Sequence, residues 1–399
     1  GPWSDPAWVD QGGIDPSLLF VDGKAWFCSN GGMPGDGKGM YVCEIDPVTG
    51  KKLSPSTFIS KGCGGKCTEA PHIYFINGWY YLLLAEGGTS YGHMAVIQRS
   101  RDIYGPYEDC PRNPVLTNLR LHRYPIQAIG HADLFEDGQG NWWMVCLGIR
   151  LLNTQLRHNL GRETFLVPVR WEDGWPVCGE GGTVAPEMKG PLPAPPEPVN
   201  IDIHEDFSGE TLSLHWNYLR NPDLSRYRAG GGNLVLQGGS QGLSELNPVF
   251  TGVRQRSFNI EGITRIYPDM EPGTRAGISV YLSDCYHYDL ALERRAGGLF
   301  VLVTRRIHDL EAVPFEQALP GTEEVELRIT SDMLWYYFSY RQKGGGWQDA
   351  GRGMTAGLCP EGAHSGSFTG VYIGLYSVGG TARFGGFSLQ NTGTGEAGA

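Results

Sequence analysis

Three stretches in the first half of the chain share one pattern: GIDPSLLFVDG at residues 13–23, TEAPHIYFING at residues 68–78 and GHADLFEDG at residues 130–138. Each stretch leads into an aromatic, strand-forming run and carries one anchoring phenylalanine, Phe20, Phe75 or Phe135. These phenylalanines lie roughly 55 to 60 residues apart, a spacing typical of a repeated four-stranded unit. The pattern therefore predicts a β-propeller.

The repeats also carry polar side chains near their starts. Equivalent points of successive propeller blades face the central channel, so we expect Asp15, Glu69 and His131 to converge there. Two carboxylates and a histidine at one channel mouth suggest acid–base chemistry. Ordinary alternatives exist for each residue: an Asx turn before proline for Asp15, a solvated loop position for Glu69 and a structural role for His131.

The composition changes at a proline-rich segment near residue 190. We expect a partial propeller over residues 1–190, an extended linker over 191–200, a second domain over 201–391 and a frayed tail over 392–399. Residues 201–391 hold at least eight short strand patterns separated by glycine- and aspartate-rich turns. That alternation indicates a two-sheet β-sandwich of jelly-roll type.

Three repeats are fewer than a closed propeller requires, because known propellers have at least about four blades. We therefore expect the remaining N-terminal blades to be missing from this chain, either cut away with an N-terminal segment or carried by a second polypeptide. An open propeller would also expose unpaired strand edges.

Composition narrows the class of protein. The chain has 399 residues, 59 glycines, 26 prolines and a net charge of −11, which suits a turn-rich all-β protein. An acidic surface argues against nucleic acids and anionic membranes as partners, and no apolar run is long enough to span a bilayer. Nine cysteines, several of them inside apolar strands, favour a reducing compartment, so we expect a cytoplasmic location. Cys63 and Cys67 could form a small disulfide loop or half of a metal site, but two loop thiols are the simpler interpretation.

Several motifs, in order, give the chain a resemblance to a known family. It resembles glycoside hydrolase family 43, in the β-xylosidase and α-L-arabinofuranosidase group with a C-terminal β-sandwich. The resemblance covers nearly the whole chain and is carried by GPWSDP (1–6), GIDPSL (13–18), TEAPHIY (68–74), YYLLLAEGGT (80–89), RSR (99–101), GPY (105–107), GH (130–131) and LGRET (160–164). Ala70 departs from the family, which usually has glycine there.

The resemblance implies a role for individual residues. Glu69 matches the family's general acid, and Asp15 matches the carboxylate that orients this acid and favours its protonated form. His131 and Arg162 match substrate-binding residues, and Thr89 lines the same funnel. The simpler alternative for Arg162 is a surface ion pair with Glu163 or another acid.

The resemblance also implies a fold, a mechanism and a metal. The family fold is a five-bladed β-propeller, and its mechanism inverts the anomeric centre with an acid and a base. The family's base is an aspartate of the first blade, and no residue here matches it, so we expect the base to lie in the missing segment. No cofactor is expected to be required, although some relatives hold calcium near the equivalent histidine.

We therefore expect an enzyme that releases xylose or arabinose units from plant hemicellulose oligosaccharides. A non-catalytic carbohydrate-binding propeller that has lost its base is the main alternative, but a pure binder needs no proton donor such as Glu69. A structural interaction propeller would leave the carboxylates unexplained. The sequence does not separate xylosidase from arabinofuranosidase activity.

Overall fold

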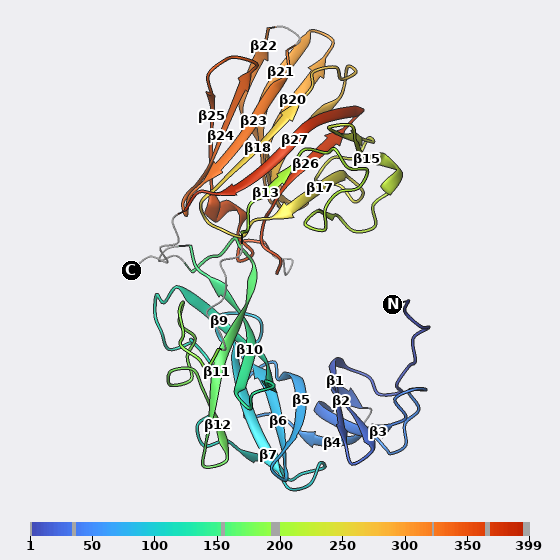
Figure 1. Cartoon of the computed structure of the whole chain (residues 1–399), viewed down its shortest axis with the longest axis vertical. Helices are drawn as coiled ribbons and strands as arrows, with labels where there is room; N and C mark the ends of the chain where they lie inside the picture. Colours follow the sequence, from blue (N-terminus) through green and yellow to red (C-terminus); the bar gives the residue numbers. More distant parts are fainter. Residues whose placement is uncertain are drawn as a thin grey trace. The chain divides into compact units, whose positions relative to one another are not determined.

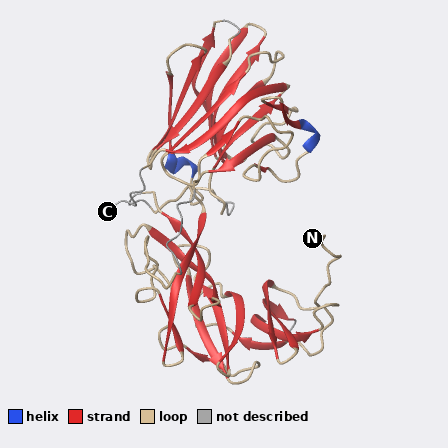
Figure 2. Ribbon diagram, viewed as in Figure 1, coloured by secondary structure: helices blue, strands red, loops and turns tan. Residues whose placement is uncertain are grey.

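The computed structural model describes residues 2–33, 37–152, 156–192, 200–320, 323–363 and 368–393. Within these ranges the chain is all-β, with two short 3-10 turns, η1 (Leu224–Arg226) and η2 (Thr355–Leu358), as its helical elements (Figure 2). No helix in the described part is long and apolar enough to cross a membrane. The predicted all-β fold class is confirmed.

The chain divides into two compact units. Unit 1 comprises Gly1–Ile149 and Glu163–Pro195, and unit 2 comprises Arg150–Arg162 and Pro196–Ala399. Residues 150–162, which the sequence assigns to the propeller domain, group with unit 2 in this division. These residues group with unit 2 because Leu152 and Leu160 join an apolar cluster with Phe258 and Cys359. Most of the expected linker and the last six residues of the tail lie outside the described residues.

Unit 1 contains three four-stranded sheets, each built from strands consecutive in sequence (Figure 1). Such sheets are propeller blades, and the first strand of each overlaps one of the three repeats. The strands are β1 (Ile14–Val21), β2 (Lys24–Met33), β3 (Gly37–Ile45) and β4 (Thr57–Ser60) in the first sheet; β5 (Glu69–Ile76), β6 (Trp79–Glu86), β7 (Met94–Ser100) and β8 (Glu108–Asp109) in the second; and β9 (Ile126–Glu136), β10 (Trp142–Arg150), β11 (Arg162–Glu172) and β12 (Trp175–Cys178) in the third.

Two apolar layers hold these sheets together, and strand β6 contributes to both. Leu82 and Leu84 pack in a cluster shared with the first sheet, whereas Tyr81 and Leu83 pack in a cluster shared with the third. Successive side chains of a strand point to opposite faces, so a strand buried on both faces is apolar throughout. This explains the unbroken apolar run from Tyr81 to Ala85 in β6.

Each of the first two sheets begins with a β-bulge. Pairing between β1 and β2 shifts between Ile14 and Ser17, and pairing between β5 and β6 shifts between Glu69 and His72. The bulged residues Asp15 and Ala70, each followed by proline, have positive φ angles of 50° and 52°. The structural counterpart of Asp15 is therefore Ala70. Glu69, which we expected to be equivalent to Asp15, lies one residue before this position.

Unit 2 is a β-sandwich. One eight-stranded sheet has the order β15-β16-β27-β18-β23-β24-β25 with β13 paired to β27, and one seven-stranded sheet has the order β14-β17-β26-β19-β20-β21-β22. A large apolar cluster is drawn from the strands of both sheets. The strands are β13 (Ile203–Glu205), β14 (Asn217–Tyr218), β15 (Tyr227–Gly230), β16 (Asn233–Gln237), β17 (Val249–Arg254), β18 (Ile260–Ile266), β19 (Arg275–Ser283), β20 (Tyr286–Arg295), β21 (Gly298–Ile307), β22 (Leu310–Leu319), β23 (Val325–Ser331), β24 (Trp335–Gln342), β25 (Gln348–Met354), β26 (Tyr372–Val378) and β27 (Thr381–Asn391).

Candidate active site

Glu69 and His131 lie together in unit 1, as the repeats predict. Glu69 is the first residue of β5, next to the bulge, and His131 lies in the middle of β9. The Glu69 carboxylate Oε1 is 3.9 Å from His131 Nδ1, and the two side chains are 20% and 34% exposed. Both are partly open to solvent, so a ligand can reach them while the surrounding strands fix their backbones.

A second histidine completes this group. His93 immediately precedes β7, is 1% exposed, and its Nδ1 lies 3.2 Å from the carbonyl oxygen of Ala128. Its ring centroid is 6.3 Å from that of His131. Gly130 leaves room for this ring, because a Cβ there would lie 2.6 Å from the imidazole carbons. The sequence analysis missed His93, since no repeat or motif distinguishes a single histidine before a strand.

Glu69, His93 and His131 each offer one ligand atom, and these atoms lie within 4.8 Å of one another. The donor set is one carboxylate oxygen and two imidazole nitrogens. Calcium takes six to eight oxygen ligands, whereas imidazole suits transition metals such as zinc. These three residues therefore do not fit the calcium ion that the family resemblance implied.

Asp15 is tied to the strand that carries Glu69. Its Oδ2 accepts a hydrogen bond of 3.1 Å from the backbone N–H of Ala70, the residue after Glu69. Two further bonds join the same segments: Ser17 Oγ donates to the Pro71 carbonyl at 2.6 Å, and Asn30 Nδ2 donates to the Thr68 carbonyl at 2.9 Å. The first sheet thus fixes the backbone on both sides of Glu69.

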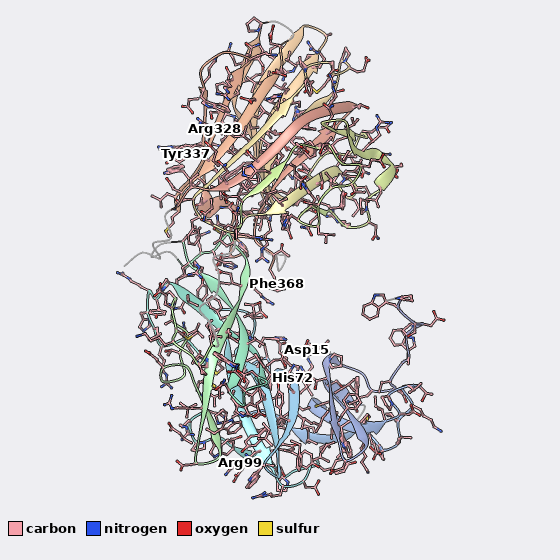
Figure 3. The ribbon with its side chains drawn as sticks, in the orientation of Figure 1. Asp15, His72, Arg99, Arg328, Tyr337 and Phe368 are labelled. Carbon is pink, nitrogen blue, oxygen red and sulfur yellow. The ribbon has the colours of Figure 1, made fainter. Side chains whose placement is uncertain are left out.

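A carboxylate that the sequence analysis did not identify links β5 to β9. Asp133 Oδ1 lies 2.9 Å from His72 Nδ1 and accepts a hydrogen bond of 3.2 Å from the hydroxyl of Tyr74. The same hydroxyl accepts the backbone N–H of Leu134 at 2.9 Å. The hydrogen bond from His72 holds the pKa of Asp133 below its usual value, with the Tyr74 hydroxyl and the charge of His131 adding to the shift. Asp15 and His72 are labelled on the neighbouring strands β1 and β5 in Figure 3.

The sequence analysis named two further residues, Thr89 and Arg162. Thr89 is exposed in the segment after β6. Arg162 begins β11 and belongs to unit 2, where its guanidinium carbon lies 3.7 Å from the ring centroid of Phe368. Its backbone N–H donates to the Phe368 carbonyl at 3.0 Å. The structure thus brings Asp15, Glu69 and His131 together in unit 1 and anchors Arg162 in unit 2.

All nine cysteines are free thiols. Cys63 Sγ donates to Asp109 Oδ1 at 3.4 Å and accepts from Asn113 Nδ2 at 3.2 Å. Cys67 is exposed two residues before Glu69. The two loop thiols are thus separate in this structure, in agreement with the simpler interpretation of the pair.

Comparison with known proteins identifies two family models along the chain. The model for glycosyl hydrolases family 43 matches residues 1–176, and the model for the β-xylosidase C-terminal concanavalin A-like domain matches residues 204–388.

Curated relatives agree with these matches. A non-reducing end α-L-arabinofuranosidase from Bacteroides ovatus is 39% identical over 388 residues, covering 95% of this chain and 71% of that protein. A xylosidase/arabinosidase from Butyrivibrio fibrisolvens is 33% identical, covering 75% of this chain and 61% of that protein. A β-xylosidase assigned in Escherichia coli is 31% identical, covering 94% of this chain and 75% of that protein. The chain thus spans part of the length of these relatives.

Solved structures give the same result. GH43B of the Bacteroides ovatus xyloglucan PUL superimposes with a TM-score of 0.87 at 37% identity, covering 98% of this chain and 78% of that one. A xylan β-1,4-xylosidase from Bacillus halodurans superimposes with a TM-score of 0.89 at 29% identity, with the same coverage. These neighbours combine a β-propeller with a C-terminal β-sandwich, which confirms the predicted pair of domain types. The chain therefore belongs to glycosyl hydrolase family 43, in the group with a concanavalin A-like C-terminal domain.

Proposed function

We propose that this chain releases xylose or arabinose units from plant hemicellulose oligosaccharides by an inverting acid–base mechanism. The substrate class is supported by the names of the relatives, which include an α-L-arabinofuranosidase, xylosidase/arabinosidases and β-xylosidases. The observation that carries the proposal is the cluster of Glu69 and His131, with Asp15 bonded to the peptide that follows Glu69.

In this proposal Glu69 is the general acid. A glycosidic oxygen is a poor leaving group unless it receives a proton as the bond breaks, so a carboxylic acid must lie beside it. Glu69 combines partial exposure with a backbone held from both sides, which allows it to meet substrate in one fixed position. Asp15 orients this acid through its hydrogen bond to the backbone N–H of Ala70, the residue that follows Glu69.

His131, Arg162 and Thr89 are proposed to bind the sugar. The imidazole of His131 lies beside the Glu69 carboxylate and can hydrogen-bond a ring hydroxyl. A guanidinium such as that of Arg162 offers several donors in a fixed plane, which suits neighbouring hydroxyls. Thr89 is exposed and presents one hydroxyl.

The general base is proposed to come from residues outside this 399-residue chain. An inverting enzyme needs a second carboxylate roughly 6.5–9.5 Å from the acid, with a water between them. Support for an additional segment comes from β1, whose side chains Ile14, Leu18 and Phe20 are 54%, 50% and 64% exposed. An exposed apolar row on a propeller sheet is a surface that another sheet would cover. Intact mass spectrometry of the natural active protein tests this: activity from the 399-residue chain alone would move the base role to a residue such as Asp15.

The stereochemistry of the first product tests the mechanism. Aryl β-xyloside and aryl α-arabinofuranoside substrates can be followed by proton NMR from the first minute, before mutarotation mixes the anomers. We expect each hydrolysed substrate to release the anomer of inverted configuration. Initial release of the retained anomer would overturn the proposal, and saccharide binding without release would favour the non-catalytic alternative.

A further inference from the structure

Three side chains of unit 2 form a hydrogen-bonded chain that the glycosidase proposal does not use. Ser244 Oγ lies 3.0 Å from His287 Nε2, and His287 Nδ1 lies 2.9 Å from Asp289 Oδ2. Ser244 lies in the segment between β16 and β17, and the other two residues lie two apart on β20, hence on one face of that strand. The order serine, histidine, carboxylate is that of an acyl-transfer triad.

The donor and acceptor atoms of these three side chains fix the direction of their hydrogen bonds. An ionised carboxylate only accepts, so His287 must donate from Nδ1 to Asp289. In the neutral imidazole Nε2 is then the acceptor, and the Ser244 hydroxyl must donate its proton to it. Asp289 thus selects the one tautomer of His287 in which Nε2 can remove the proton of Ser244.

The three side chains differ in their exposure to solvent. His287 and Asp289 are 3% and 5% exposed, and the ring of Tyr281 stacks near His287 with centroids 6.0 Å apart and planes 21° apart. Ser244 is exposed. A buried base with a fixed tautomer and an accessible hydroxyl are the two requirements for activating a serine nucleophile.

The segment around Ser244 has hydrogen bonds of its own that shape it. The backbone N–H of Glu245 donates to the Gly242 carbonyl at 3.0 Å, and the Gly242 N–H donates to the Glu245 carboxylate at 2.6 Å. The N–H of Asn247 donates to the side chain of Gln241 at 2.7 Å. The turn therefore has three closing bonds that do not involve Ser244 Oγ, so that hydroxyl is not required to hold the turn.

We propose that Ser244 is a nucleophile for a small, uncharged carboxylic ester, with His287 as its general base and Asp289 as the positioning residue. An uncharged ester is favoured because Glu245 adjoins Ser244 and the chain has a net charge of −11, which repels anionic esters. The Ser244 backbone N–H meets no backbone acceptor within the described ranges, and in this proposal it donates to the developing oxyanion.

The reaction balances without a cofactor. Ser244 Oγ bonds to the ester carbonyl carbon while His287 Nε2 takes the hydroxyl proton. The bond from the carbonyl carbon to the alcohol oxygen then breaks, and Nε2 returns its proton to that oxygen, which releases the alcohol and leaves acyl-Ser244. Water attacks the acyl carbon, His287 takes a proton from it and returns that proton to Ser244 Oγ, and the carboxylic acid leaves.

Labelling with a fluorophosphonate probe, read by intact mass and by mapping the modified peptide, tests the proposal. The matched control is Ser240→Ala, since Ser240 is an exposed serine in the same segment. We expect one adduct, on Ser244, in the wild type and in Ser240→Ala, and none in Ser244→Ala. An unlabelled wild-type protein, or equal labelling of Ser244→Ala, would overturn the proposal. Ser244 is exposed and its removal leaves the turn bonds in place, so the variant should fold and keep its glycosidase activity.

Two further variants test the roles of the buried residues. His287→Gln should slow labelling at least about 100-fold, the usual lower range for loss of a general base. Asp289→Asn should lower the maximal labelling rate at saturating probe and leave the half-saturating probe concentration unchanged. A purely structural role would instead show as a lower melting temperature with the labelling rate unchanged, and that result would contradict the assignment. p-Nitrophenyl acetate hydrolysis should follow the same order of variants.

Discussion

Gly130→Ala tests whether the packing of His93 sets the geometry of the Glu69 cluster. A Cβ at position 130 would lie 2.6 Å from the His93 ring carbons, whereas carbon atoms normally approach to about 3.5–4.0 Å. The ring would therefore have to move by about 1 Å. Gly130 has no positive φ angle, so the backbone itself tolerates alanine and the ring is the obstacle.

Two measurable losses should follow from this displacement. Overpacking of a buried side chain costs about 1–3 kcal/mol, which should appear as a lower melting temperature. A misplacement of about 1 Å at a reacting centre can cost about 100-fold in rate, so kcat/KM on aryl glycosides should fall by that order. Gly138→Ala is the matched control, because a Cβ there has no atom within 4 Å. It should leave both quantities unchanged.

The double variant Gly130→Ala/His93→Ala separates the clash from other effects. Removing the ring gives the new methyl group space. The double variant should therefore lose less stability than the sum of the losses in the two single variants. Full additivity, or a Gly130→Ala protein with wild-type stability and activity, would refute the inference that His93 packing positions this site.

Two carboxylates give further tests. Asp133 has a folded-state pKa below its unfolded value, so its hydrogen bond with His72 stabilises the fold above about pH 4, and this contribution disappears as the pH falls through the folded pKa. Asp133→Asn should therefore lower the melting temperature at pH 7 and have little effect near about pH 3; an equal deficit at both pH values would contradict this. Asp15→Asn retains an oxygen acceptor for the Ala70 N–H, so it should keep stability but lower kcat, whereas Asp15→Ala should also lose about 1–3 kcal/mol of stability. Wild-type kcat in both Asp15 variants would remove Asp15 from the proposed mechanism.

The repeat pattern predicted the blades well because each blade is one sequence-local unit. All four strands of a sheet follow one another along the chain, so the phenylalanine spacing reports the sheet directly. The expected equivalence of Glu69 with Asp15 was wrong by one residue, because Glu69 lies one position before the counterpart of Asp15. Alignment of the two repeats on Pro16 and Pro71, or on Phe20 and Phe75, pairs Asp15 with Ala70, and the matching β-bulges show the same equivalence in the structure.

Residues whose role depends on long-range contacts could not be predicted in this way. His93 and Asp133 join the site through contacts with other sheets or strands, with no motif of their own. The same applies to the segment 150–162, which is adjacent to β10 in sequence but packs with unit 2. Arg254 donates to the carbonyls of Leu160 and Arg162 at 2.8 and 2.7 Å, a pairing separated by more than ninety residues.

Glu69→Gln tests the central claim most directly, because it removes the proton and keeps the shape of the side chain. The variant and the wild type should be compared on a natural oligosaccharide and on a dinitrophenyl glycoside, whose leaving group needs no protonation. If Glu69 is the general acid, kcat/KM on the oligosaccharide should fall by at least about 100-fold while the dinitrophenyl glycoside loses far less. The melting temperature should be unchanged. Equal, mild losses on both substrates would contradict the assignment of Glu69 as the acid.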